Sequence, residues 1–169
     1  MRWSHFQDVL PVLTLGIGYG GTFLTERFRD RSAHRRARTA AIAEFERSLL
    51  LDTQEALYQY AGEMQDFAHS LRGEAARSYG TVVETAWRAG ARLEMLTTRL
   101  ESDATREVLS EVLGAGQAVS SGTWPDVQDE WSDDDWALLD KIVDTMLECE
   151  QRAAVMLGDR LRTLTYGAA

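Results

Sequence analysis

The sequence predicts an all-α protein in which one N-terminal transmembrane helix leads into a three- to four-helix antiparallel bundle with a long first helix. Only two prolines occur among 169 residues, whereas Ala, Leu, Glu and Arg are abundant, so a sheet-rich fold would lack its turn residues. Apolar residues recur at helical spacing through most of residues 39–169, as in amphipathic helices that share a core. Residues 9–24 contain no charged side chain. We therefore divide the chain into an anchor (1–24), a basic segment (25–38) and a bundle (39–169).

The uncharged run of 16 residues is the candidate membrane span. A bilayer core needs about 20 apolar helical residues and at least about 17, so the run is slightly short. Trp3, Phe6 and Phe28 flank it and suit the two membrane interfaces. A cleaved signal peptide, a buried soluble helix and a helix lying in the membrane plane are the alternatives.

The basic segment follows the uncharged run at once and carries six arginines against two carboxylates, a local charge of +4. Its arginines are Arg27, Arg29, Arg31, Arg35, Arg36 and Arg38. Arginines near an anionic membrane surface each gain about 1 kcal/mol, so we expect this segment to bind lipid headgroups. One arginine precedes the span and six follow it, and the positive-inside rule then places the N-terminus outside and the bundle in the cytoplasm of the cell.

Gly16 and Gly20 form a Gly-xxx-Gly pair within the uncharged run. Such a pair lets two membrane helices approach closely, so a homodimer is one expectation. Glycines that only pack or kink the helix are the equal alternative.

The remainder of the chain is strongly acidic. Because the whole chain carries −9, residues 1–24 sum to zero and the basic segment carries +4, residues 39–169 carry −13. Phosphate backbones repel such a charge, so we expect no nucleic-acid partner. Cys149 is the only cysteine, which excludes an intrachain disulfide and a cysteine-based metal site.

The first bundle helix is expected over residues 39–71, continuous with the anchor because no helix breaker separates them. Gly73 is a candidate C-terminal cap. The second helix is expected from about residue 74 to residue 101, with Tyr79, Val83 and Gly90 facing inward and Trp87 at the edge of the apolar stripe.

A third helix is predicted to begin at Ser102 or Asp103, because either side chain can accept a hydrogen bond from a freed backbone amide. An uninterrupted helix through this point is the alternative. Gly114 and Gly116 are expected to weaken the end of the third helix, and residues 120–125 form the clearest loop signal.

Ser132, followed by three aspartates, predicts the start of the last helix, because a serine cap and negative charge both suit a helix N-terminus. Its apolar stripe includes Cys149, expected to be a small core residue with no obvious base beside it, and the helix is expected to end near Tyr166. Trp124, Trp131 and Trp136 cluster around the preceding loop. They are interpreted either as a lid over one end of the bundle or as an exposed patch for a partner protein.

Catalytic, cofactor-binding and metal-binding signatures are not found in the sequence. Asp66 and His69 have the spacing of half a di-iron motif, but the second half is missing. The acidic run in residues 126–135 lacks the glycine and the ligand spacing of a calcium loop. We therefore expect no catalytic residue, no cofactor and no metal.

The chain contains, in this order, an apolar span, then Thr-Glu-Arg-Phe-Arg-Asp-Arg (residues 25–31), then helices that contain Arg-Leu-Glu-Met-Leu (92–96). In this order of segments the chain resembles small membrane-anchored helical proteins of high-GC Gram-positive bacteria. The resemblance implies an origin and no residue roles. Our first hypothesis is a membrane-anchored interaction or scaffolding protein with an unknown protein partner. The alternatives are a membrane-active effector, holin-like or defence-associated, and a soluble ligand-binding protein or enzyme with a buried N-terminal helix.

Overall fold

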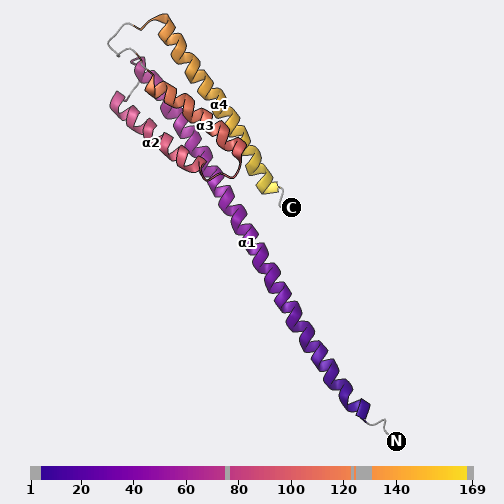
Figure 1. The fold of residues 1–169 in the computed structure, drawn as a ribbon. Helices are drawn as coiled ribbons and strands as arrows, with labels where there is room; N and C mark the ends of the chain where they lie inside the picture. The colour runs from indigo at the N-terminus through magenta and orange to yellow at the C-terminus, as the bar shows by residue number, and fades with distance from the viewer. Residues whose placement is uncertain (1–4, 75–76, 123, 125–130, 167–169) are drawn as a thin grey trace. The chain divides into compact units, whose positions relative to one another are not determined.

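The computed structural model describes residues 5–74, 77–122, 124 and 131–166, and the side chains from residue 33 onward within these ranges. The described residues form four helices: α1 (His5–Leu71), α2 (Tyr79–Thr97), α3 (Asp103–Ser121) and α4 (Asp133–Tyr166) (Figure 1). The all-α prediction is confirmed. The chain divides into two compact units, Met1–Phe45 and Glu46–Ala169.

The predicted membrane span, residues 9–24, lies in the part of α1 whose side chains are outside the described residues. Within the described part of the chain, no helix combines the length and the apolar character that crossing a membrane requires.

Serine caps set the starts of the last three helices. The Ser78 hydroxyl accepts from the Thr81 amide at 3.4 Å, so α2 begins at Tyr79 and not near residue 74 as predicted. Ser102 caps α3 in the same way, which confirms the predicted break between the second and third helices. Ser132 accepts from the Asp135 amide at 3.2 Å, and the Asp135 carboxylate accepts in return from the Ser132 amide at 3.0 Å. This reciprocal capping box also lowers the pKa of Asp135, because the Ser132 hydroxyl and amide donate to its charged form.

The end of α1 is fixed by Gly73, whose φ of 72° lies in the left-handed region. The amides of Gly73 and Glu74 donate to the carbonyls of Ser70 and His69 at 3.1 and 3.0 Å. These bonds satisfy carbonyls that the helix leaves open at its end. The predicted glycine cap is therefore confirmed.

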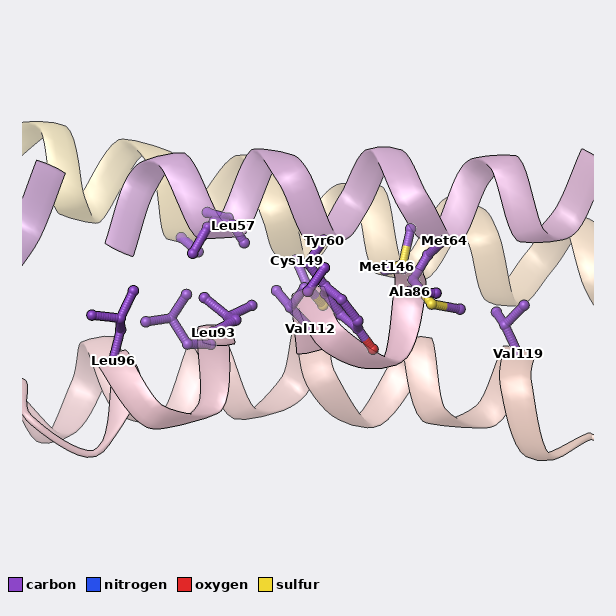
Figure 2. Close-up of a cluster of buried hydrophobic side chains, with 14 of the residues drawn as sticks. Leu57, Tyr60, Met64, Ala86, Leu93, Leu96, Val112, Val119, Met146 and Cys149 are labelled. Carbon is purple, nitrogen blue, oxygen red and sulfur yellow. The ribbon is translucent and has the colours of Figure 1, made fainter. Parts of the chain in front are cut away.

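Side chains from all four helices bury one hydrophobic core in the second unit. Its largest fully buried members are Leu57 and Met64 of α1, Leu93 of α2, Leu109 of α3 and Leu139, Met146 and Leu157 of α4. Figure 2 shows part of this cluster between the helices. The helical-bundle prediction is confirmed, and Cys149, 5% exposed, lies in this core.

A group of polar side chains connects α1 to α2 and to the segment just before it, at the surface of the bundle. The Glu63 carboxylate accepts from the Thr85 hydroxyl at 2.6 Å and from the Arg77 guanidinium at 3.0 and 3.4 Å. Arg77 also contacts Asp66. The hydrogen bonds to Glu63 and then to Asp66 raise the pKa of Arg77 above its ordinary value.

Candidate functional site

A pocket of about 270 Å³ opens between α1, α2 and α3. Its floor comes from α1, one wall from α2 and the other wall from α3. The lining residues are Tyr60, Met64 and Phe67 of α1; Tyr79, Val83, Ala86, Trp87, Gly90, Ala91 and Glu94 of α2; and Leu113, Gln117 and Ser120 of α3. The volume is slightly below the range of about 300–1,000 Å³ that is usual for small-molecule sites. A compact molecule would therefore fit.

Tyr60 reaches from the floor of the pocket between two glycines. A Cβ added at Gly90 of α2 would lie 3.0 Å from Tyr60 Cε2. A Cβ added at Gly116 of α3 would lie 3.0 Å from Cε1 and 2.7 Å from Cζ, and closer still to the hydroxyl oxygen. Real Cβ atoms essentially never show the contacts under 3.0 Å found at Gly116, and the 3.0 Å contact at Gly90 is tighter than nearly all real ones, so the two glycines make room for the ring.

The Tyr60 hydroxyl is buried but only weakly hydrogen-bonded. Tyr60 is 4% exposed, and its hydroxyl donates to the Leu113 carbonyl at 3.5 Å, a long distance for such a bond. Burial raises the pKa of Tyr60 to about 12, so the hydroxyl keeps its proton at neutral pH. Its oxygen lone pairs remain available to accept a hydrogen bond from a bound molecule.

Large apolar side chains stand exposed along the α2 edge of this pocket. Trp87 is 74% exposed, Tyr79 51% and Val83 38%. The Tyr79 ring also packs against Phe67 in the floor, with 5.7 Å between centroids. Tyr79 and Val83 were predicted to face inward, and this is wrong, because both are exposed and line the pocket.

The only charged side chain among the described lining residues is acidic. Glu94 lies on the α2 wall, and no ion pair engages its carboxylate within the described part of the chain. The second unit carries 23 acidic and 11 basic residues, a net charge of −12. The pocket thus combines aromatic faces, a hydroxyl acceptor and a carboxylate.

The three tryptophans of the predicted patch do come together. The rings of Trp124 and Trp131 stack at 5.8 Å and those of Trp131 and Trp136 at 4.1 Å. All three are partly buried and packed against the core. The Trp124 indole donates to the Val119 carbonyl at 2.5 Å, and the Arg72 guanidinium lies 5.7 Å from the Trp136 ring centroid. This packing is the arrangement expected of a lid over the end of the bundle. The interpretation as an exposed patch for a partner protein stays a prediction.

Cys149 has charged neighbours that its sequence context did not indicate. Its Sγ lies 3.8 Å from a carboxylate oxygen of Glu111 on α3 and 3.0 Å from Nη2 of Arg152 on α4. Arg152 and Glu111 form an ion pair at 2.6 Å. The expectation of no base beside this thiol is therefore wrong. The hydrogen bonds to Cys149 and Glu111 raise the pKa of Arg152.

The predicted lipid-binding arginines are described only in part. Arg35, Arg36 and Arg38 are exposed on α1. The side chains of Arg27, Arg29 and Arg31, and the predicted packing pair Gly16 and Gly20, lie outside the described residues. Asp66 contacts Arg77, and His69 Nδ1 lies 3.2 Å from Glu74. No cluster of metal-ligating side chains occurs among the residues that the structure describes.

Comparisons with known proteins identify no relative. No protein-family model matches the chain, and no curated protein or solved structure matches it. The geometry of the pocket is therefore the basis for a functional proposal.

Proposed function

We propose that this chain is a membrane-anchored binding protein. Its N-terminal segment attaches it to a membrane, and its helical bundle binds a molecule that enters the pocket between α1, α2 and α3. The observation that carries the binding half is the exposure of Trp87, at 74%, beside a pocket floored by buried aromatic rings. Exposed apolar side chains that adjoin a well-formed pocket mark binding sites in soluble domains.

The anchoring half of the proposal rests on the sequence. The uncharged residues 9–24 are followed at once by the basic segment 25–38. This order favours a span whose arginines meet lipid headgroups, with the N-terminus outside and the bundle in the cytoplasm. Pairing of two copies through Gly16 and Gly20 is part of the same proposal.

Fractionation of C-terminally tagged protein tests the anchor. Membranes are extracted with carbonate, and protease is added to intact and to lysed spheroplasts. We expect the protein to resist carbonate and the tag to be cleaved only after lysis. Release into the soluble fraction would refute the anchor and leave a soluble binding protein.

A thermal-shift screen of compact apolar fragments with the full chain tests the binding half. A ligand that binds only the folded state raises the unfolding temperature, and at 100 times its Kd it adds about 2.7 kcal/mol of stability. Ala91→Trp places a large side chain in the pocket lining and should abolish the shifts. Met95→Trp, at an exposed α2 position that does not line the pocket, is the matched control and should keep them. Shifts that survive Ala91→Trp would locate binding elsewhere.

A further inference from the structure

We propose that the pocket between α1, α2 and α3 binds a compact organic cation, an ammonium group carried on an apolar body. This inference rests on the binding function proposed above and names its ligand class. Three features of the lining point to the same chemistry: the aromatic faces, the polar atoms and the charge.

The aromatic side chains of the lining favour a cation. Four rings line the pocket, with Tyr60 and Phe67 in the floor and Tyr79 and Trp87 along the α2 edge. The face of an aromatic ring carries negative potential and attracts an ammonium group within about 6 Å of its centroid, and Trp is the strongest such ring. The exposed Trp87 is free to cover a bound ligand, because its indole has no ring contact or hydrogen bond among the described residues.

The polar atoms of the lining are placed to receive positive charge. The Tyr60 hydroxyl directs its proton toward the Leu113 carbonyl and leaves its lone pairs open. The Glu94 carboxylate has no ion-pair partner in the described residues. An anionic ligand would meet an uncompensated carboxylate here, since no Arg, Lys or His is among the described lining residues. Such a contact is unfavourable because like charges repel, and salt screens the repulsion because Glu94 is exposed.

Charge beyond the pocket acts in the same direction. The second unit carries −12. Arg92 lies close to Glu94 in sequence but does not line the pocket, and its guanidinium contacts Gln59 and Glu55 of α1. Arg88 pairs with Glu84 along the exposed side of α2. Neither arginine neutralises Glu94. A negative surface raises the local concentration of a cationic ligand.

A matched pair of probes separates this inference from the proposed function. Phenyltrimethylammonium and tert-butylbenzene have the same shape and differ in one charge. The full chain, with ¹³C-methyl-labelled methionine, is titrated with each probe, and the NMR signal of Met64, which lies in the floor of the pocket, reports occupancy. The Ala91→Trp variant, with its fold checked by circular dichroism, corrects for probe that dissolves in the detergent.

We expect the cation to bind at least tenfold more tightly than its neutral isostere. Glu94→Gln should remove most of this preference while it leaves the neutral probe unchanged. Glu107→Gln, an exposed carboxylate of α3 outside the pocket, should leave both affinities as they are. Equal or tighter binding of tert-butylbenzene would overturn the cation inference and keep the binding pocket. If neither probe shifts Met64, the pocket itself loses its proposed role.

Discussion

Gly116→Ala should destabilise the bundle, although alanine is the better helix former. Gly116 lies in α3, and an added Cβ would come 2.7 Å from Tyr60 Cζ and closer to its hydroxyl oxygen. Relief of that overlap moves a buried ring, and overpacking of this kind costs about 1–3 kcal/mol. The helix propensity of alanine returns about 1 kcal/mol. The net change is therefore a loss of as much as about 2 kcal/mol.

Gly114 offers a matched control two residues away in the same helix. A Cβ there meets nothing within 4 Å, so Gly114→Ala should stabilise the chain by up to about 1 kcal/mol through propensity alone. Because propensity cancels between the two variants, their stabilities should differ by about 1–3 kcal/mol. At about 4 °C per kcal/mol for a domain of this size, the melting temperatures should differ by roughly 4–12 °C.

The assay is thermal and urea unfolding of both variants, followed by circular dichroism at 222 nm. Tyr60→Phe removes the closest atom of the overlap, so it should recover part of the loss in the Gly116→Ala background, with a coupling free energy of about 0.5–2 kcal/mol. Equal stability of Gly116→Ala and Gly114→Ala would refute the placement of Tyr60 against Gly116, and with it the floor of the pocket.

Three further predictions concern the same bundle. Burial raises the pKa of Tyr60 to about 12 from an ordinary 10.0. The contribution of the Tyr60 hydroxyl to stability is therefore complete below pH 10 and is lost as pH rises toward 12. When the unfolding midpoint is followed in alkaline solution, it should fall less steeply in Tyr60→Phe than in the unchanged chain, and an identical fall would contradict the burial of the hydroxyl. Glu63→Gln should lower the free energy of unfolding by about 1–3 kcal/mol, because the carboxylate accepts from Thr85 and Arg77 at a largely buried position. Glu84→Gln removes a carboxylate from an exposed ion pair and should change the free energy of unfolding by less than about 0.5 kcal/mol in the same urea titration. Trp131→Ala should lower the free energy of unfolding by about 2–4 kcal/mol, since the Trp131 ring stacks between two others against the core. If Trp131→Ala and the exposed-site variant Trp87→Ala unfold at the same temperature in thermal melts, the tryptophans do not form a packed lid.

The starts of α3 and α4 and the end of α1 could be predicted because they depend on residues close in sequence. Ser102 and Ser132 cap helices with atoms three residues away, and Gly73 ends α1 through bonds to the preceding turn. Local hydrogen bonds of this kind leave a signature in the sequence. The late start of α2 at Tyr79 was missed because a cap at Ser78 was not weighed against the helical spacing that follows residue 74.

The pocket could not be predicted, because periodicity shows which face of a helix is apolar but not whether a neighbouring helix covers it. The apolar face of α2 is wide enough to include Tyr79 and Val83, yet both remain partly exposed. A signal was present in the two mid-helix glycines, each of which sacrifices about 1 kcal/mol of helix propensity. Gly116 was interpreted as a weak helix end, whereas a glycine inside a helical pattern also marks close approach of another group. Here that group is Tyr60.

Features that lower the stability of the fold favour the pocket over the tryptophan cluster as the functional site. At the cluster, the indoles stack and pack against the core, and Trp124 donates a hydrogen bond. Its unfavourable features are the buried Trp131 Nε1, which has no hydrogen-bond partner among the described residues, and the close approach of Gly122 to Trp124. At the pocket, the chain keeps an exposed Trp87, two glycines inside helices and a buried hydroxyl with a 3.5 Å hydrogen bond. The two glycines and the weak hydrogen bond cost stability, and such costs concentrate where function requires them. A bound cation would recover part of that stability by covering Trp87 and by placing its positive charge beside the Tyr60 hydroxyl oxygen and the Glu94 carboxylate.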